Sequence, residues 1–222
     1  MRTWLKENRG FLVFLLCFGV FRTAVADWNP IPSGSMRPTL LEGDVVFVNR
    51  LAYDIKLPLT DIILARLAEP ERGDIVTFSS PKDGERLIKR IVAVPGDRVE
   101  MQDDTLLVNG LPAQYLQKAL VAEPVNSETT VTAVRSVEQI LGSDREVQFL
   151  PEVSARRSFE PITVPLDAYF MLGDNRDNSA DSRYIGVVPR NMLIGQTQRL
   201  LVSANITGNW LPRLERFGKS LR

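Results

Sequence analysis

Two segments of the chain carry a hydroxyl and an amine that could do chemistry together. In residues 31–40 (IPSGSMRPTL), two prolines and a glycine hold an extended backbone that presents Ser33 or Ser35. In residues 86–94 (RLIKRIVAV), Lys89 lies among apolar and β-branched residues of a predicted strand. A buried lysine can lose its proton and act as a general base, whereas an arginine in practice cannot. A serine nucleophile activated by Lys89 is therefore one chemistry that these residues allow.

The composition excludes most alternatives to such a pair. The 222 residues include no histidine and one cysteine, Cys17. This excludes Ser-His-Asp triads, Cys-His pairs, histidine-based zinc sites and intrachain disulfides. Basic and acidic side chains balance at 27 each, so the sequence has no broad basic field for nucleic acid. We therefore expect no nucleic-acid partner, no metal and no cofactor.

A third segment is unusually polar. Residues 173–184 (GDNRDNSADSRY) directly follow an apolar strand predicted over residues 169–172. Each segment alone has an ordinary interpretation: a linker for 31–40, two cations at a strand edge for Lys89 and Arg90, and a solvated loop for 173–184. Together, in a chain without histidine, the three segments favour a Ser-Lys dyad.

The same segments resemble a known family. PSGSMRPTL, GDIVTF, RLIKRIVAVPGD and GDNRDNSADSRY are similar to the signature boxes of bacterial type I signal peptidases, also called leader peptidases. The matching stretches are 29–50, 73–78, 86–98 and 169–189. The resemblance implies a membrane-bound serine endopeptidase that cleaves signal peptides from exported pre-proteins after A-x-A-like sites.

The resemblance also implies roles for particular residues. Ser35 takes the position of the nucleophile and Lys89 that of the general base. Ser33 matches the residue whose hydroxyl joins the backbone N–H of Ser35 in the oxyanion hole. Ser179 matches the serine that orients the lysine, and a pair that supports the site is Asp181 and Arg183. The residues expected to line the substrate pocket are Ile31, Pro32, Met36, Leu87 and Ile88.

The chain departs from the family pattern at two places. Asp167 stands where the family often has a glycine, in the turn before Tyr169. Ile185 stands where an aromatic residue is common. Neither position belongs to the expected chemistry.

The elements that must position these residues are mainly β. Short runs of β-branched and large apolar residues occur at 45–48, 75–78, 87–94 and 106–108, and Asn109-Gly110 predicts a hairpin turn. We expect an antiparallel, barrel-like catalytic β domain over 28–100 and 166–222. Residues 101–165 are expected to form an inserted β-rich region to which the resemblance does not extend. Residues 51–70 are expected to form a short helix or an irregular excursion.

The N-terminal residues predict a membrane segment. The apolar run 11–21 follows three basic residues, so we expect a cytoplasmic N-terminus at 1–9 and one transmembrane helix at 10–27. The same residues also fit a cleavable signal peptide that ends at Ala24-Val25-Ala26. The resemblance favours the retained anchor and leaves self-cleavage at that sequence open. The catalytic domain is then expected on the periplasmic side of the bacterial inner membrane, with the lipid bilayer and the export machinery as partners.

The C-terminus shows a helical pattern. Trp210, Leu211, Leu214, Phe217 and Leu221 share one face, which predicts either a helix on the membrane surface or a terminal helix or turn docked on the domain.

Two rival functions remain on the sequence alone. One is a Ser-Lys protease that cleaves only itself, as the repressors of the SOS response do. The other is an exported β domain that binds a partner without catalysis.

Overall fold

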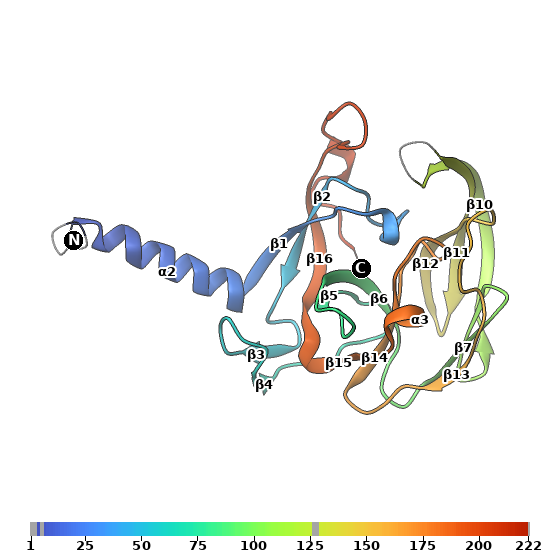
Figure 1. The fold of residues 1–222 in the computed structure, drawn as a ribbon, viewed down its shortest axis with the longest axis horizontal. Coiled ribbons are helices and arrows are strands. Elements are labelled where there is room, and N and C mark those ends of the chain that lie inside the picture. Colours follow the sequence, from blue (N-terminus) through green and yellow to red (C-terminus); the bar gives the residue numbers. More distant parts are fainter. Residues whose placement is uncertain (1–3, 5–6, 126–128, 222) are drawn as a thin grey trace.

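The computed structural model describes residues 4, 7–125 and 129–221. Of the expected cytoplasmic segment 1–9, residues 1–3 and 5–6 lie outside this description. Helix α2 (Arg9–Ala24) extends away from the strands and has no buried residue (Figure 1). Within the described part of the chain, no helix combines the length and the apolar character that crossing a membrane requires. The helix also stops short of the predicted boundary at 27, because Ala26 and Asp27 already belong to strand β1 (Ala26–Pro30), which pairs with β2 (Asp44–Asn49).

A seven-stranded antiparallel sheet confirms the mainly β prediction. Its strand order is β1 (Ala26–Pro30), β2 (Asp44–Asn49), β16 (Leu193–Ser203), β5 (Ile75–Ser79), β6 (Arg86–Ala93), β14 (Ala168–Leu172) and β15 (Val188–Pro189). Strand β6, which carries Lys89, lies between β5 and β14 and is therefore paired on both edges. β14 is buried at all five positions, as expected for its uninterrupted apolar sequence.

A four-stranded sheet packs against the far end of β6 and β14. It consists of β13 (Phe159–Thr163), β7 (Arg98–Gln102), β8 (Thr105–Val108) and β9 (Leu111–Pro112). The predicted hairpin turn joins β8 to β9: φ is +55° at Asn109 and +76° at Gly110, the left-handed geometry that an Asn-Gly turn provides. Val99 and Leu106 of this sheet share a core with Phe170 of β14.

A third sheet, which we call the inserted sheet, is formed by β10 (Gln114–Pro124), β11 (Thr130–Ile140) and β12 (Ser143–Phe149). In Figure 1 it lies at the opposite end of the molecule from α2. Its strands are long, although the sequence showed only weak strand signals here. The reason is that Glu123, Glu138 and Arg145 occupy buried positions that an apolar pattern would normally mark.

The predicted alternative of a short helix within residues 51–70 is wrong. This segment forms a hairpin of β3 (Asp54–Lys56) and β4 (Ile63–Arg66). A tertiary contact decides its conformation: the Lys56 ammonium is buried and donates to the backbone carbonyls of Asn191, at 2.7 Å, and Leu193, at 2.5 Å.

At the C-terminus the predicted alternative of a turn docked on the domain is confirmed, and the helix alternatives are wrong. A single 3-10 turn, η3 (Leu214–Arg216), forms in place of a helix. Arg216 pairs with Asp44 of β2 at 2.6 Å, and Leu221 is buried in the core beside Leu200 of β16. These long-range contacts outweigh the helical periodicity of the sequence.

Candidate active site

Ser35 and Lys89 meet where the turn that carries the serine approaches strand β6. Ser35 lies in a 3-10 turn, η1 (Gly34–Met36), and the Nζ of Lys89 is 2.8 Å from its Oγ. The same Nζ donates to the backbone carbonyl of Ile88 at 3.1 Å. The structure thus brings together two residues that are 54 positions apart in the sequence.

The Lys89 amine is buried. Only 2% of the residue is exposed. Burial lowers the pKa of Lys89 to about 8, because the charged form loses its hydration, while the carboxylates of Asp181 and Asp174 pull the pKa partly back up. A substantial fraction of Lys89 is therefore neutral near pH 8, as a general base requires.

The polar segment after β14 holds the backbone of the serine turn. The backbone N–H of Asn175 donates to the carbonyl of Ser35 at 3.1 Å, and the Asn175 side chain donates to the carbonyl of Gly34 at 3.0 Å. Gly173 also lies against the serine turn and has no room for a side chain, since a Cβ there would lie 2.4 Å from the Ser35 carbonyl oxygen. The sequence analysis assigned no role to Gly173 or Asn175. The only feature of the sequence that pointed to them is their position in the polar segment 173–184.

Two buried ion pairs brace this segment. Arg90, the neighbour of Lys89 on β6, binds the Asp174 carboxylate through two nitrogens at 2.8 and 2.7 Å. Asp181 binds Arg183 at 2.8 Å and also accepts a hydrogen bond from the backbone N–H of Gly173 at 3.1 Å. Asp181, which is held by Arg183, thus contacts Gly173, the glycine that lies against the Ser35 carbonyl.

The expected bond between Ser179 and Lys89 is absent from this structure. The Ser179 Oγ is buried without a hydrogen-bond partner. It lies instead against Gly173, where an added Cβ would be 2.3 Å from it. The Nζ of Lys89 is already engaged by the Ser35 hydroxyl and the Ile88 carbonyl.

Two cavities open on either side of Ser35. One, of about 600 Å³, runs from Ser35 to Arg22 and Trp28 near the end of α2. All five residues predicted to line the substrate pocket line this cavity: Ile31, Pro32, Met36, Leu87 and Ile88. The other, of about 440 Å³, is lined by Arg37 and Glu42 and, from the inserted region, by Pro124 and Val125. Ser33, Ser35 and Lys89 line both cavities.

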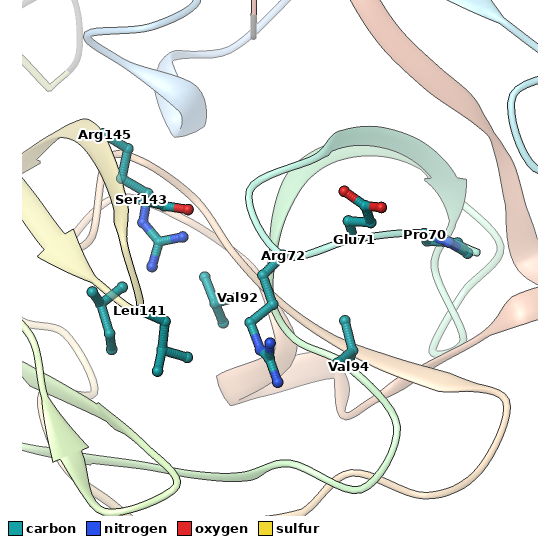
Figure 2. A pocket seen from close by; sticks show the side chains of 9 residues that line it. Pro70, Glu71, Arg72, Val92, Val94, Leu141, Ser143 and Arg145 are labelled. Carbon is teal, nitrogen blue, oxygen red and sulfur yellow. The ribbon is translucent and has the colours of Figure 1, made fainter. Parts of the chain in front are cut away.

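A third cavity lies away from Ser35 and Lys89. Figure 2 shows Leu141, Ser143 and Arg145 approaching it from one segment and Arg72 from another, around Val92 of β6. Its volume is about 320 Å³, and neither Ser35 nor Lys89 lines it. The cavities beside the serine turn are therefore the ones that a substrate of the dyad would occupy.

The two departures from the family pattern have structural explanations. Asp167 has φ of +57°, the left-handed conformation that favours glycine, and its carboxylate pairs with Arg66 at 2.9 Å on the surface. Ile185 packs against the core that contains Tyr169 and Val188. Neither residue lines the cavities at Ser35.

A serine hydroxyl beside a buried amine, with two cavities next to it, is an arrangement that could serve a serine endopeptidase without histidine. Comparison with known families agrees: the family model described as "Signal peptidase, peptidase S26" matches residues 1–202. The chain belongs to this family and is a serine endopeptidase that removes signal peptides.

Curated relatives match over most of their length. The signal peptidase I of Pseudomonas aeruginosa is 36% identical over 207 residues, which cover 86% of this chain and 70% of the relative. That of Rickettsia prowazekii is 31% identical, covering 91% of this chain and 82% of its own. That of Buchnera aphidicola (subsp. Schizaphis graminum) is 30% identical, covering 94% and 78%.

Proposed function

We propose that this signal peptidase works as a Ser-Lys dyad, with Ser35 as nucleophile and Lys89 as general base. The observation that carries the proposal is the 2.8 Å distance between Lys89 Nζ and Ser35 Oγ, with the amine buried. A lysine with a pKa near 8 is poised to accept the serine proton at mildly alkaline pH.

The reaction follows from this geometry in two stages. Neutral Lys89 takes the proton of the Ser35 hydroxyl as Oγ attacks the scissile carbonyl. The oxyanion is held by the Ser33 hydroxyl and the backbone N–H of Ser35. Lys89 then protonates the leaving amine, and water hydrolyses the acyl-enzyme with Lys89 again as the base.

The substrate is an extended peptide with small side chains before the cut. The 600 Å³ cavity, which Ser35 also lines, has apolar residues in its wall, among them Ile31, Met36 and Ile88. Such a surface accommodates alanine-sized side chains and supports cleavage after A-x-A-like sequences. The signal peptide lies in this cavity, and the residues after the cut lie in the cavity beside Arg37.

Although α2 by itself is shorter than a membrane span, we propose that the N-terminal segment containing it anchors the enzyme in the bacterial inner membrane, with the N-terminus cytoplasmic and the catalytic region periplasmic. The apolar side chains of α2 are exposed, including Phe11, Phe14 and Leu16. At its end Arg22 pairs with Asp27 at 2.9 Å and lies 4.5 Å over the ring of Trp28, a combination suited to a membrane–water boundary. The bilayer and the export machinery are then its partners.

The sequence Ala24-Val25-Ala26 is poorly placed for self-cleavage. Ala26 is buried and pairs with Asn49 in the seven-stranded sheet. A peptide bond in this position must leave the sheet before it can enter an active site. This favours retention of the anchor, and mass analysis of the purified N-terminus tests it, since a chain that starts at Asp27 would show the opposite.

The decisive experiment is cleavage in trans. Detergent-solubilised enzyme is given a pre-protein with an A-x-A site, beside Ser35→Ala, Lys89→Ala and, as a matched control, Lys118→Ala at an exposed position. We expect both dyad variants to lose at least roughly 10⁴-fold in kcat while staying folded, and Lys118→Ala to keep full activity. Ser33→Ala is expected to lose roughly 10²–10³-fold.

The same experiment separates the rivals. An unmutated enzyme that fails to cleave the pre-protein in lipid as well as in detergent would favour the self-processing or the binding function. Retained activity in Lys89→Ala would contradict the lysine base while leaving the peptidase activity in place.

A further inference from the structure

Arg37 lies two residues after the nucleophile and folds back over the serine turn. Its guanidinium is largely buried and binds Glu42 at 2.7 Å. A Cβ placed on Gly34 would lie 3.1 Å from the Arg37 Nε and 3.1 Å from a carboxylate oxygen of Glu42. The Arg37–Glu42 pair therefore packs directly on the Cα of Gly34, the residue between Ser33 and Ser35.

The second carboxylate on Arg37 comes from the inserted sheet. Glu123 of β10 is 2% exposed and hydrogen-bonds to the Arg37 guanidinium. Its other oxygen lies 3.3 Å from Arg135 of β11. A buried carboxylate is costly unless it is paired, so Glu123 is stable in this position only while it has its two arginines. The ion network thus runs from the inserted sheet into the nucleophile turn.

The peptide plane between Gly34 and Ser35 connects this network to the chemistry. The peptide unit is planar and trans, so the Gly34 carbonyl and the Ser35 N–H point in opposite directions. The carbonyl is held from two sides, by the Arg37 backbone N–H at 3.0 Å and by the Asn175 side chain at 3.0 Å. Fixing this carbonyl fixes the direction of the Ser35 N–H, which is the proposed oxyanion donor.

We propose that Glu123 is a positioning residue of the peptidase: by holding Arg37 over Gly34, it aims the Ser35 N–H at the oxyanion. This inference rests on the proposed Ser-Lys function. It also gives the inserted sheet, from which none of the proposed chemical groups comes, a part in the rate of the reaction. Glu123 itself touches neither Ser35 nor Lys89 in any contact of the described residues.

The test is a double-mutant cycle on the full chain with a pre-protein substrate. Glu123→Gln, Arg37→Gln and the double variant are compared by kcat per titrated active site, KM and the pH midpoint of activity. Glu146→Gln serves as the matched control, because it removes a carboxylate of the same sheet whose partner Lys118 is exposed. We expect Glu123→Gln to lose roughly tenfold in kcat, with KM changed less than about twofold, since a misdirected donor weakens the transition state more than substrate binding.

The pattern across the cycle identifies the role. If Glu123 acts through Arg37, the double variant is no slower than Arg37→Gln alone, and the pH midpoint stays in place because the carboxylates near Lys89 are untouched. Losses that multiply in the double variant would overturn the proposal. So would a Glu123→Gln enzyme with fewer titrated sites but normal kcat per site, which is what a purely structural role predicts.

Failure of the inference is distinguishable from failure of the proposed function. An unmutated enzyme without turnover refutes the peptidase mechanism itself, whereas active unmutated enzyme with an equally fast Glu123→Gln variant refutes the inference alone. If Glu123→Gln melts below the assay temperature, Glu123→Asp is used instead. Aspartate keeps the charge but has a shorter side chain. Full activity of Glu123→Asp together with a slow Arg37→Gln enzyme supports the proposal. An Arg37→Gln enzyme as fast as the unmutated one overturns it.

Discussion

Two regions of the molecule, the inserted sheet around Glu138 and the site around Lys89, bury ionisable side chains with opposite effects on their pKa values. In the inserted sheet, Glu138 is completely buried and pairs with Arg176 of the polar segment and with Arg145 of β12. Burial alone would raise the pKa of Glu138, but the two arginines overcome this and hold it at about 2. At the dyad, Lys89 is equally buried and no carboxylate is bonded to it in the described structure, so burial dominates and lowers its pKa to about 8.

The difference lies in where the nearby acids are committed. Asp174 is bound by Arg90 and Asp181 by Arg183, which leaves Lys89 with a hydroxyl and a backbone carbonyl as partners. A buried charge that is paired is a structural fixture, whereas a buried amine without a counter-ion is destabilised in its charged form and is free to exchange a proton. The molecule therefore builds rigidity in one region and reactivity in the other from similar burial.

The largest effect is expected at the paired charge. Glu138→Gln leaves Arg176 and Arg145 buried without their carboxylate, and we expect the free energy of unfolding to fall by about 3–5 kcal/mol. Chemical denaturation of purified enzyme measures this. A loss below about 1 kcal/mol would mean that water or the Tyr115 hydroxyl, which donates to Glu138 at 2.8 Å, compensates for the missing charge.

Replacing Lys89 is expected to raise the free energy of unfolding, whereas replacing Glu138 lowers it. The pKa of Lys89 is near 8 in the fold and 10.5 in the reference state, so below pH 8 the folded state carries a protonation penalty of about 3 kcal/mol. Lys89→Met should therefore be more stable than the unmutated enzyme at pH 7. The unfolded state binds more protons between pH 8 and 10.5, so the stability of the unmutated enzyme should rise across that window and the advantage of the variant should shrink. Denaturation at pH 7 and pH 10 checks both signs.

Activity should follow the same ionisation. With the neutral amine as the proposed base, kcat/KM should rise about tenfold per pH unit up to a midpoint near 8 and then level off. At pH 6 the rate should be about 100-fold below the plateau. A profile that stays flat between pH 6 and 10, with substrate binding unchanged, would contradict a lysine base.

The smallest effect is expected at an exposed pair of the inserted sheet. Lys118 and Glu146 lie 2.5 Å apart, but about half of each side chain is in water. Glu146→Gln should change the free energy of unfolding by less than about 1 kcal/mol and leave kcat unchanged. A large loss here would show that the inserted sheet is marginal as a whole, and would weaken the contrast with Glu138.

The sequence supplied more of the site than of its surroundings. A serine turn rigidified by proline and glycine, a lysine in an apolar strand and a dense polar segment were each visible locally, and their resemblance to a family named their expected roles. The contacts of Arg37 with Glu123 and of Arg176 with Glu138 were not predictable. These partners lie on strands whose buried positions hold charges, so no apolar periodicity marked them and nothing local paired them.

The expectations of a C-terminal helix and of a Ser179–Lys89 hydrogen bond failed for the same reason, because contacts between distant segments decided both. The C-terminal residues have helical periodicity, yet Leu221 is buried beside β16 and Arg216 pairs with Asp44, and these contacts impose a turn and an extended chain. Ser179 matched a lysine-orienting position, yet its hydroxyl lies against Gly173. Propensity and resemblance describe a segment by itself, and long-range packing then selects among its conformations.

The sequence by itself determined the mainly β class, the absence of histidine chemistry, and the identity of a serine and a lysine that could replace it. These depend on residue type, turn chemistry and strand periodicity, which act over a few neighbouring positions. Only the tertiary structure decided that Lys89 reaches Ser35 and that Asp174 and Asp181 are engaged by arginines rather than by Lys89. Burial and pairing depend on segments far apart in the chain, and they set whether a lysine is a surface cation or a base.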